Sequence, residues 1–78
     1  MMAQFTLIVR SRDAATRDPH VYHFPTAQDA WDATVRSLRA LLAERADAFD
    51  GKQIEIADAT GHPVAVVHPY DAMPARYH

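Results

Sequence analysis

The single long helical pattern of this chain, from Thr26 to about Ala46, is the feature that most constrains its fold. Four large apolar side chains recur in it at spacings of four, three and four residues: Trp31, Val35, Leu38 and Leu42. In an α-helix this spacing places them on one stripe. Because such a stripe has to be buried, we expect the rest of the chain to form a surface on which the helix packs.

The start of this helix carries a signal of its own. Thr26 followed three residues later by Asp29 is close to a capping box, with Asp in place of the more usual Glu or Gln. Pro25 disfavours helical backbone at Phe24, the residue before it. Thr26 is therefore the expected N-cap.

Outside the helix, the sequence contains short segments with the pattern of β-strands. Apolar and polar residues alternate over four of them: residues 4–10, 20–24, 52–58 and 64–68. The order strand, strand, helix, strand, strand predicts an α+β fold, in which a four-stranded, mainly antiparallel sheet carries one amphipathic helix on one face. We expect residues 1–78 to form one small domain, with a core over about 4–68 and an irregular tail over 69–78.

The alternation also predicts which face of the sheet each strand residue occupies. Nine apolar or aromatic residues are expected on the face toward the helix: Phe5, Leu7, Val9, Tyr22, Phe24, Ile54, Ile56, Val64 and Val66. The opposite face then carries three apolar residues, Ile8, Val21 and Val67, in addition to its polar ones. That face is more apolar than a fully solvated one needs to be.

Two turn signals separate the later segments. Gly51 suits a left-handed turn into the third strand, and Phe49 before it continues the apolar stripe of the helix. The run from Asp58 to Gly61 predicts a hairpin turn, because an Asp side chain can hydrogen-bond nearby backbone and Gly accepts a positive φ.

The run from Asp50 to Gly61, Asp-Gly-Lys-Gln-Ile-Glu-Ile-Ala-Asp-Ala-Thr-Gly, is the most specific motif of the chain. With the apolar first strand and the Ala-rich helix after Pro25, it resembles a family of short alphaproteobacterial domains of unknown function with strand-strand-helix-strand-strand order. The resemblance covers roughly residues 5–72. It implies the same fold, and it implies no catalytic residues, because the family has none assigned.

The size of the chain favours self-association. A chain of 78 residues buries only about 60–65% of its unfolded surface, which leaves a narrow margin of stability. The sequence has no cysteine, which excludes disulfides, thiolate metal ligands and cysteine nucleophiles. We therefore expect a homo-oligomer, in its simplest form a dimer.

Candidate catalytic and metal-binding residues are few. His20 and His23 have a His-x-x-His spacing, but residues three apart on a strand point to opposite faces, so a shared metal is not expected. No Ser or Thr lies in a Gly-flanked elbow, and two glycines in total exclude a phosphate-cradling loop. Trp31 could stack on a ligand, but its place in the helical stripe favours core packing. We predict no enzyme activity, no metal and no cofactor.

These observations predict a non-enzymatic interaction or regulatory module, which self-associates or binds an unknown protein partner through the outer sheet face or a strand edge. The expected interaction surface comprises Ile8, Val21, His23, Val67, Tyr70 and Tyr77. The alternative is a nucleic-acid-binding accessory protein that uses the first loop, with Arg10, Arg12, Arg17, His20 and His23. A net charge of −2 and dispersed arginines make nucleic acid the less favoured partner.

The expected location is the cytoplasm. No apolar run approaches the roughly 18–20 residues that span a bilayer. The N-terminal residues lack the basic segment of a signal peptide and pass directly into a strand pattern. We therefore expect no association with a membrane.

Overall fold

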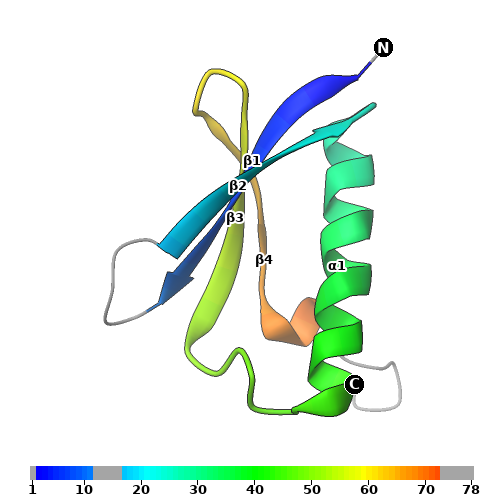
Figure 1. Cartoon of the computed structure of the whole chain (residues 1–78), viewed down its shortest axis with the longest axis vertical. Coiled ribbons are helices and arrows are strands. Elements are labelled where there is room, and N and C mark those ends of the chain that lie inside the picture. Colours follow the sequence, from blue (N-terminus) through cyan, green and yellow to red (C-terminus); the bar gives the residue numbers. More distant parts are fainter. Residues whose placement is uncertain (1, 12–16, 73–78) are drawn as a thin grey trace.

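A computed structural model describes residues 2–11 and 17–72 of the chain, with the side chains of Arg17 and Asp18 left out. Its elements in order are β1 (Ala3–Ser11), β2 (Arg17–Phe24), α1 (Ala27–Glu44), β3 (Lys52–Asp58), β4 (Pro63–Val67) and the 3₁₀-helix η1 (Pro69–Ala72). The four strands form one sheet in the order β2-β1-β3-β4, and every neighbouring pair is antiparallel. The helix lies along one side of this sheet (Figure 1). The predicted α+β fold is confirmed.

Thr26 is the N-cap of α1, as predicted. Its backbone is extended, and its hydroxyl accepts a hydrogen bond from the Asp29 backbone N–H at 3.1 Å. The same hydroxyl donates to the Asp29 carboxylate, also at 3.1 Å. This pair satisfies one of the N–H groups that the first turn of a helix leaves without an intrahelical acceptor.

The face of α1 that packs most deeply is rotated from the predicted stripe. Ala30, Thr34 and Leu38 are its buried residues. Trp31, Val35 and Leu42 are only partly buried and pack at the periphery of the core. Short side chains at the first two buried positions let the helix approach the sheet closely, and the Thr34 hydroxyl donates to the Ala30 carbonyl at 2.8 Å, so its burial leaves no unsatisfied donor.

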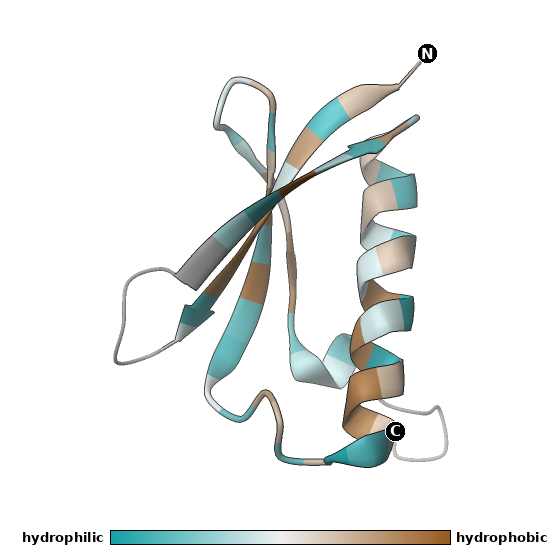
Figure 2. Ribbon diagram, viewed as in Figure 1, coloured by the Kyte–Doolittle hydropathy of each residue, from teal (hydrophilic) through white to brown (hydrophobic). Residues whose placement is uncertain are grey.

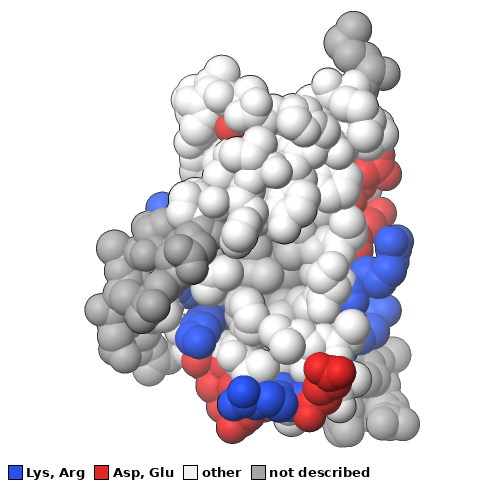
Figure 3. Space-filling model, viewed as in Figure 1, with Lys and Arg blue, Asp and Glu red and all other residues white. Residues whose placement is uncertain are grey.

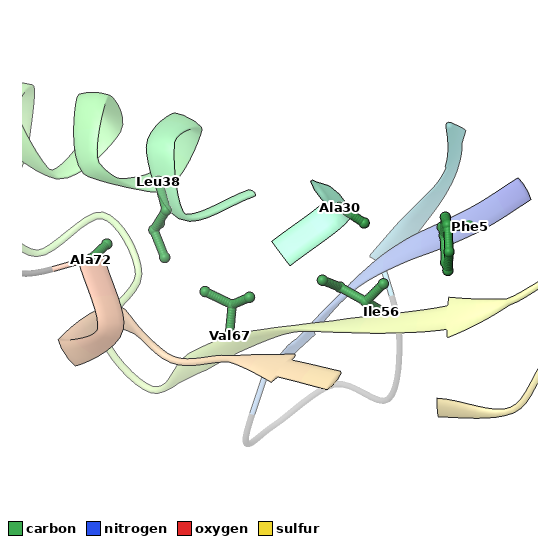
Figure 4. Packing of buried hydrophobic residues seen from close by; sticks show 6 residues of the cluster. All are labelled: Phe5, Ala30, Leu38, Ile56, Val67 and Ala72. Carbon is green, nitrogen blue, oxygen red and sulfur yellow. The ribbon is translucent and has the colours of Figure 1, made fainter. Parts of the chain in front are cut away.

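The orientation of β4 is opposite to the prediction. Val67 is fully buried and points toward the helix, whereas Val64, expected in the core, is 42% exposed (Figure 4). The pairing explains this: Ala57 lies opposite Pro63, but Ile56 lies opposite Ala65, so Val64 is an extra residue in β4. One extra residue turns all following side chains to the other face of a strand.

Both turn signals are confirmed. Gly51 and Gly61 have positive φ angles of 71° and 88°. In the hairpin between β3 and β4, the Asp58 carboxylate accepts hydrogen bonds from the backbone N–H groups of Thr60 and His62, each at 3.0 Å. Phe49 packs against the core, as its spacing from the helical stripe predicted.

Part of the segment expected as an irregular tail is ordered. The element η1 packs against α1, and its last residue, Ala72, belongs to the buried core. The Arg39 side chain donates from Nε to the Ala72 carbonyl at 3.3 Å, and the His68 backbone N–H donates to the Asp71 carboxylate at 2.8 Å. The first of these bonds joins η1 to the helix, and the second stabilises the turn at the start of η1. Residues 73–78 lie outside the described part of the chain.

Candidate interaction surface

The position of α1 leaves part of the sheet uncovered. Among the strands, the helix packs most extensively against β4, and it also contacts η1. Toward β2 the two layers diverge and enclose an open groove of about 230 Å³, which we call the β2 groove. Its lining comes from β1, β2, α1, the segment after α1, and β3: Leu7, Tyr22, Phe24, Ala33, Thr34, Ser37, Leu38, Leu41, Phe49 and Ile54.

The β2 groove is apolar, and none of the described residues that line it is charged. Tyr22 and Leu41 belong to this lining and are nevertheless 46% and 37% exposed. The last turns of α1, which contribute Leu38 and Leu41, are the most hydrophobic part of the helix (Figure 2). Ligand pockets for small molecules usually enclose about 300–1,000 Å³. The smaller and open β2 groove suits the insertion of one or two apolar side chains better than the enclosure of a cofactor.

A free sheet edge runs beside this groove. β2 is the outermost strand, and it has β1 as its only neighbour in the described part of the chain. Residues His20 to Phe24 pair without interruption with Leu7 to Ala3, and none of them is Lys, Arg, Asp or Glu. The outward backbone groups of such a strand can pair with another chain. Figure 1 looks onto this strand, and Figure 3 shows an almost uncharged surface in the same region.

Aromatic rings continue from the β2 edge into the core. The ring centroids of His20 and Tyr22 are 6.3 Å apart, and those of Tyr22 and Phe24 are also 6.3 Å apart. Phe24 lies 6.5 Å from Phe5 of β1, which is buried. All three β2 residues share the helix-facing side of the strand. The edge is therefore anchored to the core by ring packing, while Tyr22 stays accessible.

The opposite edge of the sheet is less suited to pairing. β4 has only five residues, starts at Pro63 and is followed by Pro69. The extra residue Val64 interrupts its register. Prolines, shortness and bulges are features by which proteins block exposed edges. β2 is longer, with eight residues, and its stretch from His20 to Phe24 contains no proline and no register shift.

Three residues of the predicted interaction surface lie on the outer sheet face. Ile8 of β1 is partly buried there, and Val21 and His23 of β2 are exposed. Between β1 and β3 the same face carries an ion pair in which Arg10 donates to the Glu55 carboxylate at 3.2 Å. The outer face is therefore mixed in polarity, and Val21 is its exposed apolar residue on β2.

The other three predicted residues do not join this surface. Val67 is in the core, which corrects its predicted outward orientation. Tyr70 is exposed on η1, the element that packs against α1, and it stacks on His68 with ring centroids 5.0 Å apart. Tyr77 lies outside the described residues.

The remaining polar candidates do not gather into one site among the described residues. The strand places His20 and His23 on opposite faces, as expected. Within the described residues there is no group of three or more His, Cys, Asp or Glu side chains arranged to hold a metal ion. Of the arginines proposed for nucleic-acid binding, Arg10 pairs with Glu55, and Arg12 lies outside the described residues.

One cluster has the residue types of a nucleophilic triad, but its geometry is that of a turn. The Thr60 hydroxyl donates to the Asp58 carboxylate at 2.7 Å and lies 2.8 Å from His62 Nδ1. Because a hydroxyl has one hydrogen, this arrangement makes Nδ1 the donor to the hydroxyl oxygen, so the imidazole is not placed to remove the Thr60 proton. The Thr60 hydroxyl and the His62 backbone N–H lower the pKa of Asp58.

The β2 groove was not predicted from the sequence. Six of its residues were expected in the core, because periodicity shows which side of an element is apolar but not how completely another element covers it: Leu7, Tyr22, Phe24, Leu38, Phe49 and Ile54. Leu41 was the available signal: it adjoins Leu42, and it broadens the apolar face of the helix beyond the stripe.

The fold and the groove define a small α+β protein whose β2 edge carries no charged residue from His20 to Phe24. The chain belongs to the family described as Domain of unknown function (DUF6894), whose model matches residues 4–70. The predicted resemblance to a family of unknown function is confirmed at this level. The chain has no significant match among curated proteins or solved structures. No helix in its described portion has the length and apolar character needed to cross a membrane.

Proposed function

We propose that this protein is a non-enzymatic interaction module, whose binding site is the free edge of β2 together with the β2 groove. One observation supports this most directly: an unpaired, uncharged strand stretch borders an open apolar groove. In strand addition, backbone hydrogen bonds along an edge supply affinity, and adjacent pockets that accept side chains supply specificity. The β2 edge and groove offer both parts.

The groove supports binding rather than catalysis. Its polar lining consists of hydroxyl groups, and the Thr34 hydroxyl is already engaged with the Ala30 carbonyl. The lining offers no His, carboxylate or amine to act as a general acid or base. An apolar side chain that enters it would bury Leu41 and the ring of Tyr22.

Site-specific photo-crosslinking tests this proposal. A photoreactive amino acid is placed at position 41 in the groove and, in a matched variant, at Ala43, which is exposed on another side of the same helix. We expect a defined protein adduct from position 41, reduced when Tyr22→Lys is added, and none from position 43. Equal labelling from both positions, or no adduct from position 41, would refute the proposed site.

A further inference from the structure

We propose that the β2 edge pairs with β2 of a second copy of this chain, antiparallel and centred on Tyr22, in a two-fold symmetric dimer. This inference rests on the proposed function, because it names the partner of the same edge and groove. It makes a specific statement about register. Tyr22 would lie opposite Tyr22 of the second copy, and His20 would lie opposite its Phe24.

The prolines determine this register. Pro19 and Pro25 flank the stretch from His20 to Phe24, and Tyr22 is its central residue. Pro has no N–H to donate, so a new ladder is best confined to the residues between them. Pairing centred on Tyr22 places Pro19 of each copy opposite Pro25 of the other. All five residues between them can then pair without involving either proline.

The alternation of side chains requires the two-fold axis to pass through a residue position, and Tyr22 is such a position. Two antiparallel edge strands related by a two-fold axis perpendicular to the sheet keep the helices of both copies on one side. Residues directly opposite each other must then face the same side. Centring on Tyr22 meets this condition: Tyr22, His20 and Phe24 share the helix-facing side, and Val21 and His23 share the outer side.

The charge distribution favours a second copy as the occupant. A symmetric interface brings identical residues near each other, so any formal charge close to the axis would meet its own sign. The stretch from His20 to Phe24 contains no Lys, Arg, Asp or Glu. In the view onto β2, charged side chains gather along the outer side of the helix and at the lower end of the molecule (Figure 3). Between His20 and Phe24, two copies can therefore meet without repulsion between formal charges.

The exposed apolar residues also fit such a dimer. Val21 is 54% exposed on one side of β2, and Tyr22 is 46% exposed on the other. Pairing would cover Tyr22 with Tyr22 of the second copy on the helix-facing side, and Val21 with its His23 on the outer side. The groove of each copy would lie beside the axis, where Leu41 is open to the partner. Burial of such residues between copies stabilises a chain whose own core is small.

Charge pairing at position 22 tests both the dimer and its register. The mass in solution is measured by light scattering and sedimentation for the full chain, at high micromolar concentration. We expect the wild type at twice the 8.7 kDa mass of the chain. Tyr22→Lys and Tyr22→Glu should each run as monomers, because like charges would lie directly opposite each other. An equimolar mixture of the two variants should restore the dimer.

The controls keep the outcome decisive. Circular dichroism must show that each variant is folded, and Val21→Lys, changed at an exposed outer position, provides a second way to weaken the edge. Val64→Lys changes an exposed residue of β4, the strand at the other edge of the sheet, and should leave the dimer intact. A monomeric wild type, or a mixture that stays monomeric while the wild type is a dimer, would overturn the inference. Crosslinking from position 41 to a different protein would then still support the proposed function.

Discussion

Val67 of β4 lies directly opposite Ile54 of β3, and both side chains face α1. This pairing exists because Val64 is an extra residue that shifts the register of β4. Without it, the register of the hairpin turn would place Val66 opposite Ile54. The contribution of β4 to the core is therefore set by one bulge.

The bulge predicts a large loss of stability for substitution of one valine of β4 and a small loss for another. Val67→Ala should lower the free energy of unfolding by about 2–3 kcal/mol, because it removes buried methyl groups and leaves a cavity. Val64→Ala, at a 42% exposed site, should change it by no more than about 0.5 kcal/mol. Urea unfolding of both variants measures the difference. A larger loss at Val64 would show that β4 has the uninterrupted register instead.

Two leucines of α1 provide a matched pair for the groove. Leu38 is 2% exposed, and Leu38→Ala should destabilise the fold by about 3–5 kcal/mol. Leu41→Ala should cost less than about 1 kcal/mol in dilute protein, because Leu41 lines the open groove. Thermal unfolding at low concentration compares them. Similar losses for the two variants would mean that the groove is closed in solution.

The turn at Asp58 predicts a dependence of stability on pH. Its carboxylate has a lowered pKa in the folded chain, chiefly through the Thr60 hydroxyl and then the His62 backbone N–H. The folded state therefore binds this proton less readily than the unfolded state. The stabilising contribution is present above the ordinary Asp pKa of about 3.9 and is lost as the pH falls through the lowered folded value.

The variant Asp58→Asn keeps a side-chain oxygen acceptor but does not titrate. We expect its melting temperature to fall less steeply than that of the wild type in this acidic range. Asp50→Asn serves as a control outside the hairpin and should retain the wild-type slope. Parallel melting curves for the wild type and Asp58→Asn would contradict the assignment.

Substitutions at Gly61 measure the cost of a positive φ angle without a contribution from steric crowding. Its φ is +88°, and a Cβ added there would meet no atom within 4 Å. Gly61→Ala should therefore cost about 1–2 kcal/mol through the left-handed backbone alone. Gly61→Asn should cost less, because Asn tolerates positive φ better than Ala. Chemical denaturation of the two variants tests this order, and equal stability of Ala and Gly at this site would exclude the positive φ.

Much of the local structure followed from short-range sequence signals. Thr26 and Asp29 identify the helix start because a cap depends on residues that are neighbours in the chain. Asp58 and Gly61 identify the hairpin for the same reason. The order of the elements then restricted the fold to one helix on one antiparallel sheet.

The candidate site was predicted only in part. A free strand edge was among the expected surfaces, and Val21 and His23 are exposed on β2, but the outward orientation of Val67 was wrong. The alternation of apolar and polar residues did not reveal the bulge in β4. The extra residue is an ordinary valine, yet it reverses the direction of every later side chain in the strand. Ala72 likewise had no periodicity to mark it as part of the core.

Capping, turn chemistry and apolar periodicity located the helix and the central part of each strand, because these signals act over a few residues. They did not reveal which side of β4 faces the core, how far α1 is rotated, or that Leu41 and Tyr22 line an open groove. These features depend on how side chains from distant segments fit together. Ala30, Thr34 and Leu38 form the buried face of the helix, and the space left open beside Leu41 and Tyr22 is the β2 groove.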